Sequence, residues 1–282
     1  MKTFKTETFS NLMILANRIQ NGSIEPIIES IDELLALKTK ENKAAWIREL
    51  SKLKDTILTG EQHWTIFNLD GNSKLPFAAF SSLPGVTCPG AGNCLDYCYS
   101  FRAWRYPAAF CRQAQNAWFM RVNNNRIAAA FKRLPKSIKL RLYVDGDFSS
   151  ISDVSFWMRL LSARTDVQAY GYSKSFNELL SFNRFGSWPE NYLLNVSGGH
   201  NHSAEIVDQV KALPITRGTF DAVSIGRKVK ANDHGTINTN RALFAAAGKA
   251  FPCPGRCGDC RNGDHACGSR KLSGIPIVIA VH

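Results

Sequence analysis

Short β-like runs alternate with helical segments roughly every 25–30 residues from residue 64 onward. The strand-like runs are Thr65–Leu69 with Pro76–Ser81, Lys139–Val144, Val167–Tyr172, Tyr192–Val196, Phe220–Ile225 and Ile275–Val281. The helical segments between them are Arg105–Phe131, Ile151–Ala163, Phe176–Phe185, Ala204–Leu213 and Asn238–Ala247. This alternation is typical of βαβ units in an α/β protein with a parallel sheet. About six strands are too few for a closed eight-stranded barrel, so we expect a partial (β/α)6-type barrel or an open parallel sheet of the doubly wound kind.

The first part of the chain has a different, helical rhythm. Pro26 suits the first turn of a helix, Trp46 begins an apolar stripe, and Gly60 is a good helix stop. We therefore predict a helical extension over residues 1–62 and an α/β domain over residues 63–282. The α/β domain is expected to contain two metal-binding cysteine loops, at residues 88–111 and, near the C-terminus, at residues 253–267.

Composition excludes several classes of protein. Of 282 residues, 44% are hydrophobic and only 21% are charged, which excludes bulk disorder. No run approaches the ~20 apolar residues of a membrane span, and the first residues lack the apolar stretch of a secretory signal. We therefore expect a cytoplasmic protein without membrane contact. The net charge of +12 needs a separate explanation.

Eight cysteines form two tight groups. Cys88, Cys94, Cys98 and Cys111 are the first, and Cys253, Cys257, Cys260 and Cys267 are the second. A chain of this size has ample core and no need of a disulfide framework, so clustered thiols indicate metal ligands, with simple buried thiols as the alternative. Cys111 falls within a predicted helix and can equally be core, so only the other seven are predicted as metal ligands.

The spacing of the cysteines favours an iron–sulfur cluster, most simply 4Fe-4S, over zinc. Zinc ribbons present two similar C-x2-C pairs, whereas only Cys257 and Cys260 have that spacing here. Irregular loops with Cys-Pro steps suit iron–sulfur ligation. The eight residues can form two separate four-thiolate sites, or cysteines of both groups can share one site.

Polar residues follow several predicted strands, where α/β folds place their sites. Asp145 and Asp147 follow one strand, Lys174 the next, and Asn195 and His200 the one after. Paired carboxylates can bind a divalent metal or do acid–base work, although an Asp-Gly turn that caps the next helix is an equal alternative. Lys174 can bind an anion or be an ordinary loop lysine. These five residues are the candidates for a catalytic site.

Basic residues are interleaved with aromatic ones between Phe101 and Arg126, a pattern that suits phosphate contact and base stacking. The aromatic residues can equally be core. Further basic residues are Arg217, Arg227, Lys228, Lys230, Arg256, Arg261, Arg270 and Lys271. Without a recognisable nucleic-acid-binding motif, this interpretation depends on charge.

Four segments together resemble the phage and plasmid family called gene product 88. They are Leu75-Pro76, Thr87–Cys94 with Cys98-Tyr99, Val144–Ser149 and Tyr170–Ser175. The similarity covers roughly residues 70–200, and the closing cysteine-rich segment is analogous. The resemblance implies a mobile-element origin and cysteine-bound metal, but no reaction.

A more distant resemblance is to radical SAM enzymes, which have a six-strand partial barrel and a C-x3-C-x2-C loop after the first strand. Cys94 and Cys98 match two of the three positions, and Phe101 occupies the third. The full spacing occurs at Cys253, Cys257 and Cys260, where a fourth cysteine can close the site. A cluster held by four thiolates has no open iron for S-adenosylmethionine.

Three hypotheses follow. The first is a regulatory or interaction iron–sulfur protein of plasmid or phage type that contacts nucleic acid or a host or plasmid protein. The second is a metalloenzyme with a radical-SAM-like partial barrel, and the third is a zinc-stabilised nucleic-acid-binding module. We favour the first, because no residues form a recognisable nucleophile–base pair. Whether the protein is an enzyme stays open at this level.

Overall fold

The computed structural model describes residues 6–70, 75–227, 229–230, 232–257, 260 and 265–281. They form two compact units. One consists of the described residues of Met1–Phe67, Ser81–Thr87 and Cys98–Arg133, and the other of those of Asn68–Phe80, Cys88–Tyr97 and Leu134–His282. The first unit therefore takes in the described part of the predicted helical extension together with a later stretch of chain.

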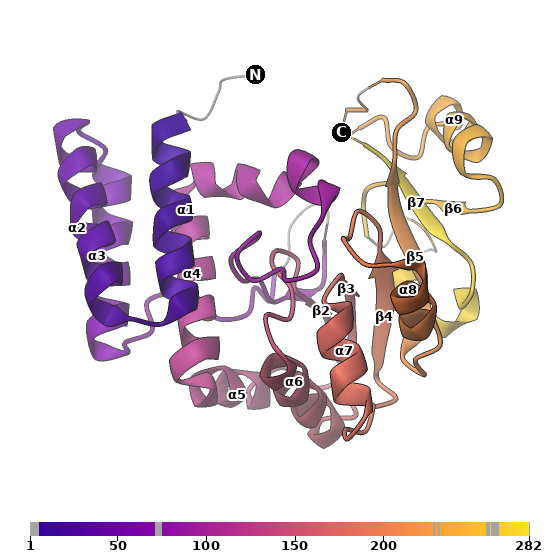
Figure 1. Ribbon diagram of the computed structural model, residues 1–282, viewed down its shortest axis with the longest axis horizontal. Coiled ribbons are helices and arrows are strands. Elements are labelled where there is room, and N and C mark those ends of the chain that lie inside the picture. The colour runs from indigo at the N-terminus through magenta and orange to yellow at the C-terminus, as the bar shows by residue number, and fades with distance from the viewer. Residues whose placement is uncertain are drawn as a thin grey trace. The chain divides into compact units, whose positions relative to one another are not determined.

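The first unit is helical. It contains α1 (Thr6–Asn21), α2 (Ile24–Lys40), α3 (Ala44–Thr59), α4 (Pro107–Val122) and α5 (Asn124–Lys132). Helices α1 to α4 lie side by side, with α1 beside both α2 and α4 (Figure 1). Helix α3 ends at Gly60, whose φ of 74° is the left-handed conformation expected of a helix-stop glycine. None of the described helices is long and apolar enough to cross a membrane.

The single helix predicted over Arg105–Phe131 is two helices. A 3-10 helix occupies Tyr99–Arg105, α4 begins at Pro107, and Asn123 separates α4 from α5. Asparagine side chains compete for backbone hydrogen bonds, so a run of three at 123–125 breaks a helix that the apolar periodicity alone would continue.

The second unit contains a seven-stranded sheet in the order β1-β2-β3-β4-β5-β7-β6. The strands are β1 (Ala78–Ala79), β2 (Lys139–Leu142), β3 (Gln168–Ser173), β4 (Tyr192–Ser197), β5 (Thr216–Val223), β6 (Phe251–Pro252) and β7 (Ile277–Ala280). All six neighbouring pairs are parallel. The sheet is an open partial barrel with surrounding helices, which confirms the predicted α/β class.

Two strand predictions need correction. Thr65–Leu69 is not a strand of the sheet, because only Asn68 pairs, in an antiparallel bridge with Ala79. β1 is accordingly a two-residue edge strand, the short kind of edge that blunts sheet-to-sheet association. β6 was not predicted, because two residues are too few to give a periodic signal.

The two faces of the sheet are covered differently. Helices α6 (Ile151–Ala163), α7 (Phe176–Asn183) and α8 (Ala204–Lys211) follow one another along one face (Figure 1). Helix α9 (Ile237–Ala247) packs over Val278 and Ala280 of β7. Ile277, whose side chain points the other way, packs against a C-terminal segment that contains three of the cysteines.

Asn191 ties the helix layer to the sheet. Its Nδ2 donates to the carbonyl oxygens of Leu161, Arg164 and Val167 at 3.1, 3.0 and 2.7 Å, and the residue is buried. The Asn191→Ala variant should lose about 2–4 kcal/mol of unfolding free energy, because it leaves buried carbonyls unpaired. Denaturant unfolding measures this, with exposed Asn201→Ala as the control. Equal stability of the two variants would contradict the assignment.

Candidate functional site

The second cysteine group lies on the sheet face opposite to the helices. Cys253 directly follows β6, and Cys267 lies in a 3-10 helix over Ala266–Gly268. Both belong to an apolar cluster, together with Cys260. The other members are Phe77, Tyr170, Tyr172, Leu193, Phe220, Phe251, Ala266, Leu272 and Ile277. Residues 258–259 and 261–264 of the segment lie outside the described residues.

All four sulfur atoms of the second cysteine group accept hydrogen bonds, that of Cys267 from Tyr172. The Gly255 N–H donates to Cys253 Sγ at 3.4 Å, and the Ala266 N–H donates to Cys260 Sγ at 3.2 Å. The Tyr170 hydroxyl donates to Cys257 Sγ over a longer 3.9 Å. Hydrogen bonds of this kind favour a negatively charged sulfur and adjust the potential of a metal bound to it.

As free thiols, Cys253 and Cys267 would be neutral near pH 7. Burial is the main cause that raises the pKa of Cys253 to about 12, against the lowering effect of the Gly255 N–H and with a contribution from the neighbouring cysteines. Burial also raises the pKa of Cys267 to about 11, against the lowering effect of a hydrogen bond from Tyr172 and of the Arg217 charge. Deprotonation at neutral pH therefore requires an additional positive charge at the sulfur atoms, such as a metal ion.

Arg217 is fully buried beneath this segment, with 0% of its surface exposed. Its Nε donates to Asn195 Oδ1 at 2.7 Å, and its Nη1 donates to the carbonyl oxygens of Leu272 and Ile275 at 3.0 and 2.9 Å. Its Nη2 donates to the Thr219 carbonyl oxygen at 3.1 Å. All these acceptors are neutral. Burial lowers the pKa of Arg217, and the groups that raise it are Cys267 and Tyr172.

This position corrects the expectation from sequence that placed Arg217 among surface basic residues. A β-bulge accommodates it: Leu194 pairs with Thr216 and Asn195 pairs with Gly218, so that Arg217 is the extra residue. Because the bulge interrupts the alternation of side chains along β5, the sequence pattern alone does not predict that Arg217 is buried.

Asn195 belongs to the same network. Its Nδ2 donates to the carbonyl oxygens of Gly171 at 3.1 Å and Cys267 at 2.9 Å. Asn195 and Arg217 together fasten the cysteine segment to the sheet. No hydrogen bond in the described residues joins Asn195 to Asp147, Lys174 or His200, with which the sequence grouped it.

The sheet face beneath the cysteines is basic. Arg141 of β2 lies over the Tyr172 ring at 4.6 Å, and Lys139 lies over the Phe77 ring at 5.3 Å. The described strands contain one carboxylate, Asp221, which pairs in register with Val278 of the α9 cluster and so points to the helix face. Within the described residues, Lys139 and Arg141 of this face therefore lie over aromatic rings.

A second polar cluster occupies the carboxyl ends of β2, β3 and β4. Asp147 is buried, and its carboxylate accepts three hydrogen bonds, from the Phe148 N–H at 2.8 Å, the Ser173 hydroxyl at 2.8 Å and the Lys174 N–H at 2.7 Å. Burial raises the pKa of Asp147, against the lowering effect of these donors and of the Lys174 charge. Asp147 thus fastens two strand-end loops together.

The other strand-end residues meet around Lys174. Its Nζ donates to Ser197 Oγ at 2.8 Å, and His202 Nε2 lies 2.8 Å from its carbonyl oxygen. The His202 N–H donates to His200 Nδ1 at 3.2 Å. Asp145 is half-buried in the same turn as Asp147, where Gly146 has a φ of 79°. The structure thus brings Asp147, Lys174 and His200 to one edge, as expected for loops that follow parallel strands.

The first cysteine group is divided between the two units. Cys88 and Cys94 belong to the α/β unit, where the Cys94 N–H donates to the Gly199 carbonyl oxygen at 3.2 Å. Cys98 and Cys111 belong to the helical unit, and Cys111 is fully buried in α4, where burial raises its pKa. Among the described residues, no three His, Cys, Asp or Glu side chains lie close enough to hold a metal ion as they stand.

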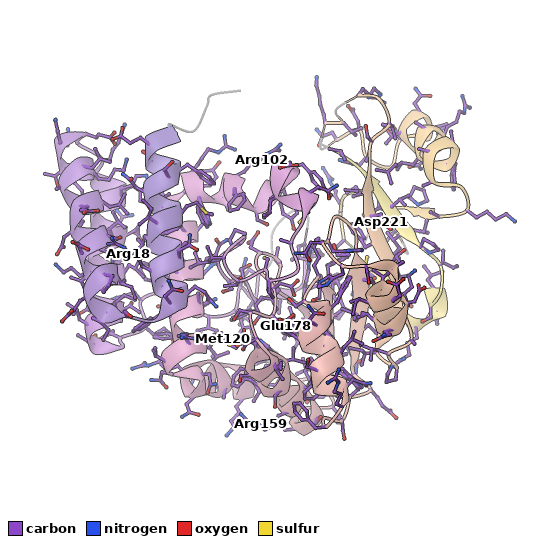
Figure 2. The ribbon with its side chains drawn as sticks, in the orientation of Figure 1. Arg18, Arg102, Met120, Arg159, Glu178 and Asp221 are labelled. Atoms are coloured by element: carbon purple, nitrogen blue, oxygen red, sulfur yellow. The ribbon has the colours of Figure 1, made fainter. Side chains whose placement is uncertain are left out.

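The predicted aromatic–basic stretch is mostly core. Trp104 and Trp118 are 0% and 4% exposed, so neither is available to stack on a base. Arg102, which is labelled in Figure 2, is exposed, and so is Arg105. The exposed aromatic residues of this stretch are Tyr99 and Tyr106.

Sequence reasoning overlooked the aromatic side of the cysteine site. Tyr170 and Tyr172 contact the cysteines, and the His265 ring lies 4.3 Å from that of Tyr170. The alternation Tyr-Gly-Tyr within a predicted strand was a usable signal, because residues two apart point to the same face. Nothing in the sequence indicated which segment that face would meet.

Comparison with known proteins gives one match. A family model described as gene product 88 matches residues 37–269, a range that includes both cysteine groups and the strand-end cluster. No curated protein and no solved structure matches the chain. None of these comparisons supports the resemblance to radical SAM enzymes.

The Asp147→Asn variant tests the buried carboxylate. It should lose about 1–3 kcal/mol at neutral pH, because an amide nitrogen cannot accept the hydrogen bonds that the carboxylate accepts. Since the folded-state pKa of Asp147 is raised, this group binds a proton more readily when the protein is folded, and its own contribution to stability should rise as pH falls toward 3.8. The gap between wild type and variant should therefore widen on acidification in urea unfolding. A gap that narrows would mean that the hydrogen bonds outweigh burial.

Proposed function

The chain belongs to the gene product 88 family, and we propose that it is an iron–sulfur member of that family, with Cys253, Cys257, Cys260 and Cys267 as the ligands. The observation that carries this proposal is the buried charge of Arg217. A buried cation whose hydrogen-bond acceptors are all neutral is costly, and within the described residues the groups that raise the pKa of Arg217 are Cys267 and Tyr172. A four-thiolate metal centre would supply the missing negative charge.

The donor set fits such a group. Four cysteine sulfurs satisfy a [4Fe–4S] cluster or a zinc ion without water or substrate as a ligand. Either centre would carry about −2, so one site lowers the chain's formal charge from +12 to about +10. The positive charges of Arg141 and Arg217, on the sheet face opposite to the helices, would then balance part of the negative charge of this centre.

Iron–sulfur is preferred to zinc because the ligand spacing is irregular and the sulfurs accept backbone hydrogen bonds, which iron–sulfur sites use to adjust potential. When bound, the cluster would supply electron transfer or redox sensing. The chain's own residues hold its ligands: Asn195 binds the Cys267 carbonyl, and Arg217 binds the backbone that follows it.

The role of the protein is proposed as regulatory, through contact with nucleic acid or with a host or plasmid protein. Support comes from the net charge and from the exposed group Tyr99, Arg102, Arg105 and Tyr106 in the helical unit. A zinc-stabilised nucleic-acid-binding module is the alternative if the metal is zinc. A metalloenzyme that uses the strand-end residues is the alternative if a reaction is found.

Anaerobic purification tests the cofactor directly. We expect a brown protein with charge-transfer absorption in the visible and with iron and acid-labile sulfide in matching amounts. Cys267→Ala should lose the colour and most of the iron, whereas Cys111→Ala, which removes another buried thiol from the helical unit, should retain both. Colourless wild-type protein with stoichiometric zinc would exclude the cluster.

Arg217 provides a second test. Arg217→Gln keeps a hydrogen-bonding side chain but removes the charge, so the iron-loaded variant should be about 3 kcal/mol or more less stable than wild type. Arg217→Lys should recover part of the loss. Exposed Arg270, which donates to the Glu190 carbonyl oxygen, is the control as Arg270→Gln. Unchanged iron content and stability in Arg217→Gln would contradict the charge argument.

A further inference from the structure

The Lys174–Ser197 pair of the strand-end cluster lies just beyond the strand residues that interact with the cysteine segment. Tyr172 and Asn195 are register partners in β3 and β4, and both interact with Cys267. Ser197 lies two residues beyond Asn195 and Lys174 two beyond Tyr172, which places their hydrogen bond one pleat, about 7 Å, nearer the carboxyl ends. Parallel sheets bind their ligands at these ends.

Lys174 carries a charge that no carboxylate of the described residues pairs with. Its Nζ donates to the neutral Ser197 hydroxyl and is half-buried. Its charge acts on two carboxyl groups, opposing the burial that raises the pKa of Asp147 and of Asp221. Asp221, which is labelled in Figure 2, lies over Gly198 and forms no ion pair with Lys174. Two of the three ammonium hydrogens remain for a ligand.

His200 adds a neutral donor. Its Nδ1 accepts the His202 N–H, so the proton of the neutral ring is on Nε2. Burial lowers the pKa of His200, and His202 and the Lys174 charge lower it further, against the raising effect of the Asp221 carboxylate and of the His202 N–H, so the ring is neutral near pH 7. Both histidine rings pack against Phe176, at 5.0 and 4.7 Å between ring centres, which holds them beside the loop of Lys174.

Backbone geometry favours a small, negatively charged ligand. Helices α7 and α8 begin just after the Lys174 and His200 loops, and their first-turn N–H groups favour negative charge. Ser175, the residue before α7, is fully buried, and its Oγ has no partner within the described part of the chain. On the loop that follows β1, Gly90 approaches the Lys174 carbonyl so closely that no side chain would fit there.

We propose that the carboxyl ends of β3 and β4 bind the phosphate group of a small phosphorylated molecule, through Lys174, Ser197 and His200. The ammonium comes from the segment after β3, and the hydroxyl and the imidazole N–H come from the end of β4 and the segment after it. A tetrahedral phosphate can accept from donors in several directions. A carboxylate offers acceptors in one plane only. The site needs no metal, so it stands apart from the proposed cluster.

Calorimetric titration of the as-purified full chain tests the site, first with inorganic phosphate and then with glycerol 3-phosphate. Binding should weaken tenfold or more in Lys174→Gln, the loss of about one charge-assisted hydrogen bond. Lys174→Arg should retain most of the affinity. Lys211→Gln, which removes an exposed lysine paired with Asp208 in α8, should bind as wild type does. Tighter binding of the ester would identify a phosphomonoester as the ligand.

Two results would overturn the proposal: no binding of either compound by the wild type, or equal affinities in Lys174→Gln and Lys211→Gln. Ser197→Ala, expected to weaken binding severalfold, replaces Lys174→Gln if that variant melts at a lower temperature than wild type. Iron content is measured in each variant. Phosphate binding that persists in Cys267→Ala would support this site even if the iron–sulfur proposal failed. Iron content that is unchanged in Lys174→Gln would leave the iron–sulfur proposal intact even if the phosphate site failed.

Discussion

A buried guanidinium organises the α/β unit of this protein. Arg217 has no water around it, so every N–H that it presents needs a protein acceptor, and it finds them in Asn195, Thr219, Leu272 and Ile275. Two of those acceptors are carbonyls of the chain that follows the last cysteine. The hydrogen-bonding needs of one side chain thereby hold the whole C-terminal segment against the sheet. In the proposed metal centre, the thiolates of that segment would balance its charge.

The sheet makes this arrangement available because its two faces differ. Helices cover one face in the usual way of βαβ units, and a loop-rich segment covers the other. That segment has little regular structure, so its packing rests on apolar contacts with Tyr170, Leu193 and Ile277 and on the Arg217 network. A metal bound by four of its side chains would add a covalent constraint where hydrogen bonds are few.

The two candidate sites are consecutive along the same strands. Tyr172 and Asn195 serve the cysteine segment, and Lys174 and Ser197 serve the strand ends. In the two proposals, thiolates would supply negative charge beside Arg217, and a bound phosphate would supply it beside Lys174. A ligand held at the strand ends would lie within about one pleat of the cysteine segment, close enough for either to influence the other electrostatically.

Local patterns in the sequence determined the α/β class, the helix end at Gly60, the polar residues that follow the strands and the grouping of the cysteines. Strand–helix alternation and turn chemistry act over short distances, so a local pattern can predict them. Local patterns did not predict the 3-10 helices, the helix break at Asn123 or the two-residue strands, because these segments are too short or irregular to show a periodic pattern of apolar residues. Only the tertiary structure decided that Trp104 is core, that Arg217 is buried, that Asn195 serves Cys267 and that the first cysteine group is divided between two units. Each of those outcomes depends on which distant segment meets a residue, and composition, spacing and periodicity contain no record of such contacts.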